Sequence, residues 1–390
     1  MLRFLTAGES HGPALVVIIE GLPAGLPISV DEIQGELARR RLGYGRGPRM
    51  RFEQDDLMLV GGVRHGFTLG SPVAIEIANT EWTRDPDRWG KEMSPAAADG
   101  PTATPLTEPR PGHADLSGMQ KYGFTDARNV LERASARETA ARVAAGCVAK
   151  ALLAQIDVDI LSHVIQLGPV RSKSPERPGP ADLDRIDESP VRCADPAAEA
   201  AMIEEIKAAA ADGDSLGGVV EVLAYGLPVG LGSHVHWDRK LDALLARGLM
   251  SINAVKAVEI GDGIEVAGRR GSAAHDPIAW DAAAGAYRRE SARAGGIEGG
   301  MSTGEVLVAR AAMKPLATLN RPVLKTVDTE TKEATVSFKE RTDVTAVPAM
   351  GVVAETMVAL VLAGEALRKF GGDSLDEFVR NHRSFVENLG

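Results

Sequence analysis

The 390-residue sequence predicts an α+β fold built from two similar halves. Apolar, β-branched runs alternate with hairpin turns and alanine-rich stretches, whereas a parallel α/β sheet needs a regular alternation of strand and helix. The chain also repeats itself: residues 8–26 and 213–231 are identical at nine of nineteen ungapped positions. Both copies end in Gly-Leu-Pro-x-Gly-Leu.

A weaker repeat indicates the same organisation. Glycines at 61, 62, 66 and 70 recur at 295, 296, 300 and 304, and each set precedes a strand-like segment. The period is too long for a solenoid. We therefore expect one domain made of two halves, about 1–170 and 190–390, around a pseudo-twofold axis. His11 is matched by Leu216 in the second copy, so the repeat itself does not require the histidine.

The elements of the first half follow from local patterns. Residues 15–19 are apolar and mostly β-branched, which predicts a buried strand. Ser29 or Asp31 is expected to cap a helix that runs into a cluster of arginines. Residues 79–118 are rich in proline with little periodicity, which indicates a long surface loop across the mouth of a site. One alanine-rich helix is expected over 126–152.

The second half begins after another loop. Residues 175–190, rich in proline and aspartate, are expected to connect the halves, and 198–211 form an exposed helix of alternating charge. The remaining predictions are strands at 219–224, 306–312 and 334–338, a helix over 352–370, and a last helix capped by Ser374.

The composition argues against several classes of protein. A net charge of −10 disfavours general nucleic-acid binding, which needs a basic face. Cys147 and Cys193 are the only cysteines and form no CxxC pattern, so we expect a cytoplasmic setting without disulfides or a metal site. Polar residues interrupt any signal-peptide core near the N-terminus. The longest apolar run, 352–363, contains Glu355, so we expect a core helix and no membrane association.

Reactive side chains gather in a glycine hinge near the N-terminus. Ser10 and His11 lie between Gly8 and Gly12, whose backbone freedom lets a ligand approach the main chain closely. A lone histidine in a turn is usually solvated, so the hinge alone leaves a structural role open.

A cluster of positive charge follows. Six arginines and no acidic residue lie between 39 and 51. Gly43, Gly45 and Gly47 interleave with them, a pattern suited to wrapping an anion, because guanidinium groups bind phosphate and carboxylate in bidentate fashion. The alternative is a solvated charged face. We expect an anion-binding site.

Two later segments carry further candidates. His113 lies in Arg-Pro-Gly-His-Ala-Asp, where Asp115 is placed to orient the ring, although a structural loop histidine is the alternative. Arg133 and Arg137 are four residues apart, so we expect them to share one helix face close to Ser135. An arginine on a tightly packed helix needs a partner anion, which favours a ligand.

The last candidate lies near the C-terminus. Asp343 follows Arg341 by two residues, and a simple ion pair within a loop is the alternative to a catalytic role.

Five ordered segments, spread along the chain from residue 8 to residue 355, resemble the chorismate synthase family. They are residues 8–15, 39–47, 110–115, 132–146 and 341–355. Thr342 stands where members commonly have serine, and it keeps the hydroxyl. Five matches in the family's order are far more specific than one short motif.

The resemblance implies a β-α-β sandwich, a homotetramer and a lyase that uses reduced FMN. The implied reaction is the 1,4-anti elimination of phosphate from 5-enolpyruvylshikimate 3-phosphate, which gives chorismate in the last step of the shikimate pathway. By the same resemblance, His11 protonates the departing phosphate, His113 stands near the flavin, and Asp343 assists removal of the C6 proton.

The resemblance also implies the binding residues. Substrate contacts fall on Ser10, Arg40, Arg46, Arg49 and Arg137. FMN contacts fall on Arg133, Ala134, Ser135, Asn253, Ala254, Gly299, Gly300, Lys314, Pro315, Leu316, Ala317, Thr318 and Arg341. In some members the positions of Arg40 and Arg46 are also associated with NADPH. The sequence leaves open whether NADPH or an external flavin reductase reduces the flavin.

Two other functions are weighed against this one. An NAD(P)H-dependent flavin reductase is disfavoured because neither a G-x-G-x-x-G after a strand nor a P-loop is present in the sequence. A phosphometabolite-binding or flavin-storage module would need the arginine cluster, but it would leave His11, His113 and Asp343 without a role.

Overall fold

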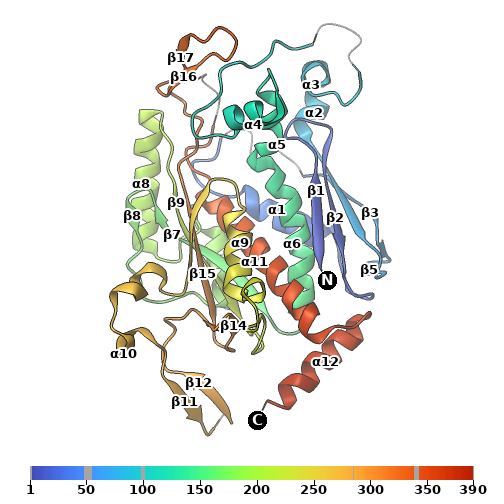
Figure 1. Cartoon of the computed structure of the whole chain (residues 1–390), viewed down its shortest axis with the longest axis vertical. Coiled ribbons are helices and arrows are strands. Elements are labelled where there is room, and N and C mark those ends of the chain that lie inside the picture. Colours follow the sequence, from blue (N-terminus) through green and yellow to red (C-terminus); the bar gives the residue numbers. More distant parts are fainter. Residues whose placement is uncertain (1, 48–54, 98–101, 284, 338–341, 390) are drawn as a thin grey trace.

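Two main antiparallel sheets enclose a layer of helices (Figure 1). The computed structural model describes residues 2–47, 55–97, 102–283, 285–337 and 342–389. The first sheet has the order β1 (Arg3–Ala7), β2 (Ala14–Glu20), β6 (Val73–Ala78), β3 (Leu57–Gly61). The second has the order β10 (Val255–Ile260), β15 (Leu307–Met313), β9 (Gly218–Tyr225), β7 (Asp159–Leu167), β8 (Val170–Arg171).

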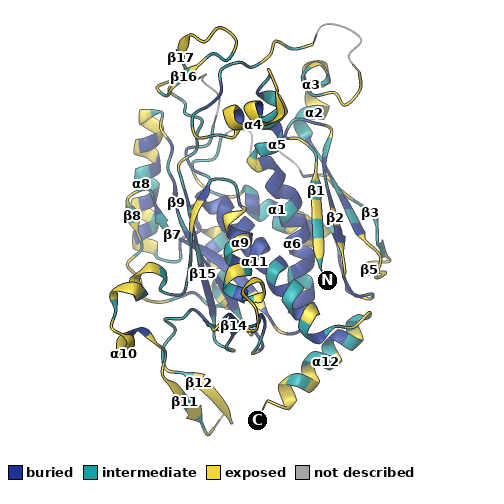
Figure 2. Cartoon of the chain, viewed as in Figure 1, coloured by how far each residue is buried: buried dark blue, intermediate teal, exposed yellow. Residues whose placement is uncertain are grey.

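The buried helices form the core between these sheets, as the dark blue ribbons in Figure 2 show. Helices α1 (Val30–Arg41) and α6 (Thr139–Ala154) contact the first sheet, and α11 (Val347–Phe370) and α9 (Leu241–Met250) contact the second. Helices α6 and α11 pack against each other across the middle. The α+β prediction is therefore confirmed. The arginine cluster begins in the last turn of α1.

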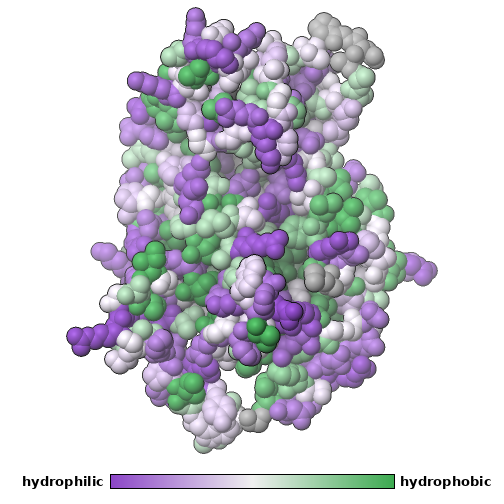
Figure 3. Space-filling view, in the orientation of Figure 1, coloured by the Kyte–Doolittle hydropathy of each residue, from purple (hydrophilic) through white to green (hydrophobic). Residues whose placement is uncertain are grey.

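Within the described ranges, one helix is long and apolar enough to cross a membrane by length and composition. It is α11, and 89% of its most apolar window is buried inside the protein, as expected for a core helix. By contrast, the surface in Figure 3 mixes hydrophilic and hydrophobic residues.

Strand and capping predictions agree well with the structure. The strand predicted at 15–19 is β2, but its side chains alternate: Leu15, Val17 and Ile19 are buried and Ile18 is exposed. Ser29 and Ser374 each form a capping box, at α1 and at α12 (Leu375–Glu387). The strand predicted at 334–338 is shorter, as β17 (Ala334–Val336) pairs with β16 (Lys325–Val327), and residue 338 lies outside the described ranges.

The helix predicted over 126–152 is broken. The chain forms α5 (Arg128–Ala134), leaves the helix at Ser135, where ψ is 144°, and then makes a 3₁₀ turn before α6. The Ser135 hydroxyl accepts a hydrogen bond from the Arg137 amide at 3.2 Å and so caps the new turn.

The two predicted loops contain helices. Residues 79–118 include α2 (Thr80–Arg84), α3 (Pro86–Glu92) and the start of α4 (Asp115–Tyr122), and 175–190 includes α7 (Leu183–Glu188). Asp85 caps α3 and Pro86 opens it, so proline begins this helix rather than preventing it. Helix α8 (Pro196–Asp212), predicted as exposed, buries Met202 and Ile206.

The strand order gives physical support to the two repeats. The order β1-β2-β6-β3 corresponds to β7-β9-β15-β10, and each four-strand set is followed by a long helix, α6 or α11. The glycine-rich repeat forms the hairpins β4–β5 (Val63–Arg64, Phe67–Thr68) and β13–β14 (Ile297–Glu298, Met301–Ser302). We propose on this basis that the halves are structural repeats. Because β7 pairs in the second sheet, their boundary would fall near residue 155.

The remaining elements project from the body of the fold. They are α10 (Gly271–Ala274) and the hairpin formed by β11 (Ile278–Asp281) and β12 (Ala286–Arg289), at the lower left of Figure 1.

Candidate active site

His11 is held at the turn between β1 and β2 by a buried carboxylate. Its Nδ1 lies 2.9 and 3.0 Å from the two carboxylate oxygens of Glu132, which also accepts the His11 amide at 2.9 Å. The Glu132 carboxylate lies against Nδ1, so exchange of a proton with a ligand falls to the other ring nitrogen, Nε2. Gly8 makes the turn possible: its φ is +98°, and a Cβ there would lie 2.3 Å from the Ala14 carbonyl oxygen.

Ser10 connects this turn to the break after α5. It is buried, and the Ser135 hydroxyl lies 3.2 Å from its own. Arg133 donates to the backbone carbonyls of Thr6 and Gly8, at 2.9 and 3.0 Å, and therefore fixes the end of β1 against α5.

Arg137 lies on a different element from Arg133, so the predicted shared helix face is wrong. The chain leaves the helix at Ser135, and Arg137 falls in the 3₁₀ turn. Its buried guanidinium pairs with Asp55 and donates to the Asn79 side-chain oxygen at 2.9 Å. The anion that this arginine needs is thus supplied by the chain itself.

His113 is the second histidine with a carboxylate on Nδ1. It bonds to Asp115, which is fully buried and also accepts from Arg110 Nε at 2.9 Å. Burial alone would raise the pKa of Asp115, but the hydrogen bonds from His113 and Arg110 and their charges hold it well below its usual range. The expectation that Asp115 orients the ring is confirmed in the structure.

A chain of hydrogen bonds joins the two histidine clusters. The Asn253 side-chain amide donates to the Ala134 carbonyl at 2.8 Å, beside Ser135. Ala254, which has a φ of +67°, accepts from the Lys314 amide at 3.0 Å. The Lys314 ammonium then donates to the carbonyl of Gly112, next to His113.

The stretch from Lys314 to Thr318 also contacts two other segments, those of Arg110 and Ser215. Arg110 donates to the Thr318 hydroxyl at 3.1 Å, and the Leu316 carbonyl accepts from the Ser215 hydroxyl at 2.8 Å. Pro315 and Ala317 lie between these contacts in the chain. The predicted FMN stretch is therefore part of the same network as His113.

Residues 42–47, which follow α1 and are called the arginine loop here, contact Asp343. Its carboxylate accepts the Gly47 amide at 2.6 Å and lies 3.3 Å from Arg46 Nε, so Asp343 pairs with Arg46. The Val344 amide donates to the Gly45 carbonyl at 2.8 Å and holds the two segments together. Arg40 is buried in the last turn of α1, before this loop. Arg49 and Arg341 lie outside the described residues.

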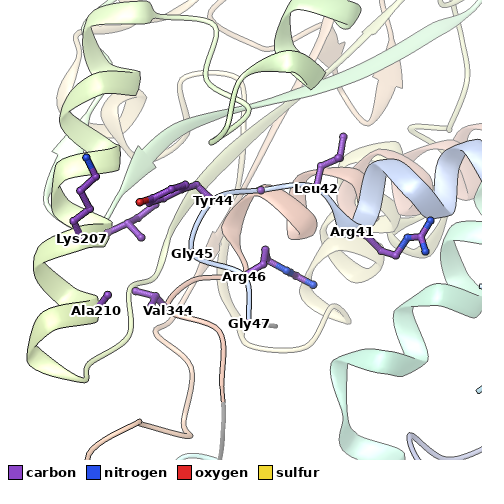
Figure 4. Close-up of a pocket in the computed structure, with 11 residues that line it drawn as sticks. Arg41, Leu42, Tyr44, Gly45, Arg46, Gly47, Lys207, Ala210 and Val344 are labelled. Carbon is purple, nitrogen blue, oxygen red and sulfur yellow. The ribbon is translucent and has the colours of Figure 1, made fainter. Parts of the chain in front are cut away.

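A pocket of about 600 Å³ opens beside this loop, lined by residues 41–47, three residues of α8 and Val344 (Figure 4). Tyr44 and Lys207 lie on one side of it, and the side chains of Arg41 and Arg46 point away from them. The lining therefore includes three cationic residues, Arg41, Arg46 and Lys207, of which Arg46 is paired with Asp343.

Gly299 and Gly300 are not brought into the network. The Gly300 carbonyl accepts from Leu241, the first residue of α9, whereas Asn253 follows the last turn of that helix. A helix of this length separates its two ends by about 15 Å. Among the described residues, no group of three or more His, Cys, Asp or Glu is arranged to hold a metal ion.

Sequence reasoning missed several residues of this site. Glu132 and Asp55 hold His11 and Arg137, and Trp89 stacks on the His11 ring. Glu132 lies 121 residues from His11 in the chain, so spacing gave no signal for the pair.

The comparisons with known proteins agree with one another. The family model described as chorismate synthase matches residues 2–367. A chorismate synthase of Salinispora tropica is 60% identical and one of Leifsonia xyli is 59% identical. These alignments cover all of this chain and 99% and 96% of those proteins.

A solved structure extends the likeness to three dimensions. The crystal structure titled as that of chorismate synthase has a TM-score of 0.79 and 39% identity, covering 100% of this chain and 98% of that one. The chain belongs to the chorismate synthase family.

Proposed function

We propose that this lyase eliminates phosphate from 5-enolpyruvylshikimate 3-phosphate in a 1,4-anti reaction that gives chorismate and requires reduced FMN. The observation that carries the proposal is the pair of histidines, His11 and His113, whose Nδ1 atoms are held by buried carboxylates on one hydrogen-bonded network. A storage protein or a flavin reductase has no need of two histidines oriented in this way.

The residues present fit a flavin. The side-chain oxygen of Asn253 is buried and, among the described residues, has no hydrogen-bond partner, which is costly unless a ligand supplies a donor. The N3–H of a flavin is such a donor. Residues that would hold the cofactor are Arg133, Ala134, Ser135, Asn253, Ala254, Lys314 to Thr318 and Arg341, with Gly299 and Gly300 by resemblance. When bound, the reduced flavin supplies the electron that assists departure of phosphate.

The anionic substrate is assigned to the arginine loop. Its phosphate and carboxylates would meet Arg40 at the end of α1 and Arg46 and Arg49 after it. The resemblance adds Ser10 and Arg137, and Arg137 would meet the substrate while paired with Asp55. His11, fixed through Nδ1 by Glu132, donates a proton from Nε2 to the departing phosphate.

Proton removal from C6 is assigned to Asp343. Its carboxylate is anchored by the Gly47 amide and paired with Arg46, and it accepts the proton directly or through a relay. We assign His113 to the edge of the flavin that carries N1 and the C2 carbonyl, where Asp115 keeps its ring oriented.

The test is an anaerobic assay with purified protein, dithionite-reduced FMN and the substrate, in which chorismate absorbance and phosphate are followed together. We expect equal amounts of both products with the flavin still reduced. When NADPH replaces dithionite, its stoichiometric oxidation per product would instead favour a flavin reductase. Tight flavin binding without either product would favour a binding protein.

His11→Ala tests the role proposed for His11 in the same assay. It should lower kcat by about a hundredfold or more while FMN and substrate still bind. His236→Ala is the control, because His236 also has a carboxylate on Nδ1, that of Asp238, but is exposed and lies outside the network. Normal turnover by His11→Ala would contradict the assignment.

The source of electrons and the assembly are part of the proposal. We place the protein in the cytoplasm as a homotetramer, with no nucleic-acid or membrane partner. Arg40 and Arg46 are the candidate NADPH contacts. NADPH oxidation by the FMN-loaded protein alone, measured under anaerobic conditions, separates self-reduction from dependence on an external flavin reductase.

A further inference from the structure

We propose that Trp89 is a positioning residue for His11, which fixes the plane of the imidazole ring while Glu132 fixes its edge. The inference rests on the role proposed for His11. It assigns a function to α3, in the segment that the sequence predicted to be a loop.

The two rings are stacked. Their centroids are 4.0 Å apart and their planes differ by 10°. Trp89 is only 6% exposed, although its neighbours on α3 are mostly exposed, so one large side chain of this helix is turned into the protein and meets a histidine there. The Arg88 guanidinium also lies over the indole, 4.3 Å from its centroid.

Helix α5 contacts both groups that restrain His11: it carries Glu132, and it binds α3, which carries Trp89. Glu132 on α5 binds the His11 ring, and one turn earlier Arg128 binds Glu92 of α3 at 3.0 Å. Glu92 in turn pairs with Arg88 at 3.1 Å, beside Trp89. The position of the indole relative to the carboxylate is therefore set through a single helix.

The two restraints do different work. A hydrogen bond at Nδ1 fixes one edge of the imidazole, but the ring can still tilt about that contact. Stacking on the indole removes the tilt and so fixes the direction in which Nε2 donates. A proton transfer that depends on this direction should slow when the flat surface is lost, whereas binding of the substrate's anionic groups should not change.

The experiment compares Trp89→Phe with Trp89→Leu in the FMN-loaded full chain. Both replacements are apolar, but only phenylalanine offers a ring to stack on. We expect kcat to fall about tenfold for leucine and within about threefold for phenylalanine, with KM changed less than about twofold in both. Trp237→Ala is the control, since Trp237 lies near His236 but is 75% exposed, and it should keep normal turnover.

A double-mutant cycle separates this inference from the proposed function. In a His11→Ala background, Trp89→Leu should change kcat less than about twofold, because the group that it positions is gone. If Trp89→Leu alone matches the native enzyme, or if its effect persists without His11, the inference is wrong. If His11→Ala itself turns over normally, the role of His11 is wrong and the inference fails with it.

A second variant tests the inference if the Trp89 variants fold poorly. Glu92→Gln removes the ion pair between α3 and Arg128 and keeps the tryptophan itself, so only the position of the indole can change. It should lower kcat in the same direction as Trp89→Leu and should likewise have no further effect without His11. Unchanged kcat in a folded Glu92→Gln protein would also overturn the inference.

Discussion

At the scale of single residues, the site uses carboxylates to orient imidazoles. Asp115 can be tested most directly, because it is fully buried and holds both His113 and Arg110. Asp115→Asn should lower kcat about a hundredfold with little change in substrate KM, since an amide no longer fixes which nitrogen of His113 carries the proton. Steady-state kinetics measure the effect. The exposed pair His236–Asp238 supplies the control, Asp238→Asn, which should leave kcat unchanged.

Residue-level prediction from the sequence succeeded where partners are close in the chain. Asp115 is two residues from His113, and its role could be read from spacing alone. Glu132 and Trp89 lie 121 and 78 residues from His11, and only the packing of α3 and α5 brings them to it. The packed helix favours a ligand for Arg133 or Arg137, and nothing local in the sequence indicates that Asp55, 82 residues away, pairs with Arg137.

At the scale of elements, the crossing of α6 and α11 depends on one glycine. A Cβ on Gly146 would lie 2.1 Å from Cβ and 2.7 Å from Cα of Thr356. Gly146→Ala should therefore destabilise the protein by about 2 kcal/mol, since overpacking outweighs the gain in helix propensity. Gly35→Ala on α1, where nothing lies within 4 Å, should be neutral or slightly stabilising. Chemical unfolding at one protein concentration measures both, and equal midpoints would contradict the prediction.

A second element-scale prediction concerns the five-stranded sheet in acid. Glu221 on β9 lies opposite His163 on β7 and Arg310 on β15, and it bonds to both and to Arg177. Burial alone would raise the pKa of Glu221, but the hydrogen bond to His163 and the charges of Arg177 and Arg310 lower it to about 2.

The sign of the pH dependence follows from this shift. The folded-state pKa lies below its ordinary value of 4.5, so the contribution of Glu221 is complete above pH 4.5 and is lost as pH falls toward 2. Glu221→Gln should therefore be less stable than the native protein above pH 4.5, with a difference that shrinks in acid. Thermal unfolding midpoints between pH 3 and 7 test this, and a difference that grows in acid would refute it.

The helix break at Ser135 shows why element boundaries were harder to predict than element types. Residues 126–152 have high helix propensity throughout, yet contacts from distant segments decide the break, including the bond from Asn253 to the Ala134 carbonyl. The capping boxes at Ser29 and Ser374 were predictable because they are local.

At the scale of the whole molecule, one carboxylate connects four elements of the core. Glu355 on α11 is fully buried and accepts from Arg39 on α1, Lys150 on α6 and Ser162 on β7. It also accepts from Arg192 at 3.0 Å. Burial alone would raise the pKa of Glu355, but the surrounding cations hold it well below its usual range.

Removing this charge should therefore affect the entire fold. Glu355→Gln removes the fully buried anion that Arg39, Lys150 and Arg192 share and leaves them, among the described residues, only Glu36 and Asp187. It should cost about 3–5 kcal/mol of stability. Glu204→Gln, which breaks an exposed pair with Lys207, is the control and should cost less than about 1 kcal/mol. Denaturant titration measures both, and comparable small losses would show that the network contributes little.

The central position of α11 has a consequence for how the protein is made. Among the described elements only α12 follows this helix, yet α11 contacts α6, α1, α9 and two strands of the second sheet. On the ribosome, the chain up to residue 346 therefore emerges with the inner faces of these elements still open to water. The nascent protein must keep this apolar surface from aggregating until α11 has been translated. The interval before α11 emerges is therefore the stage at which the chain most needs a chaperone.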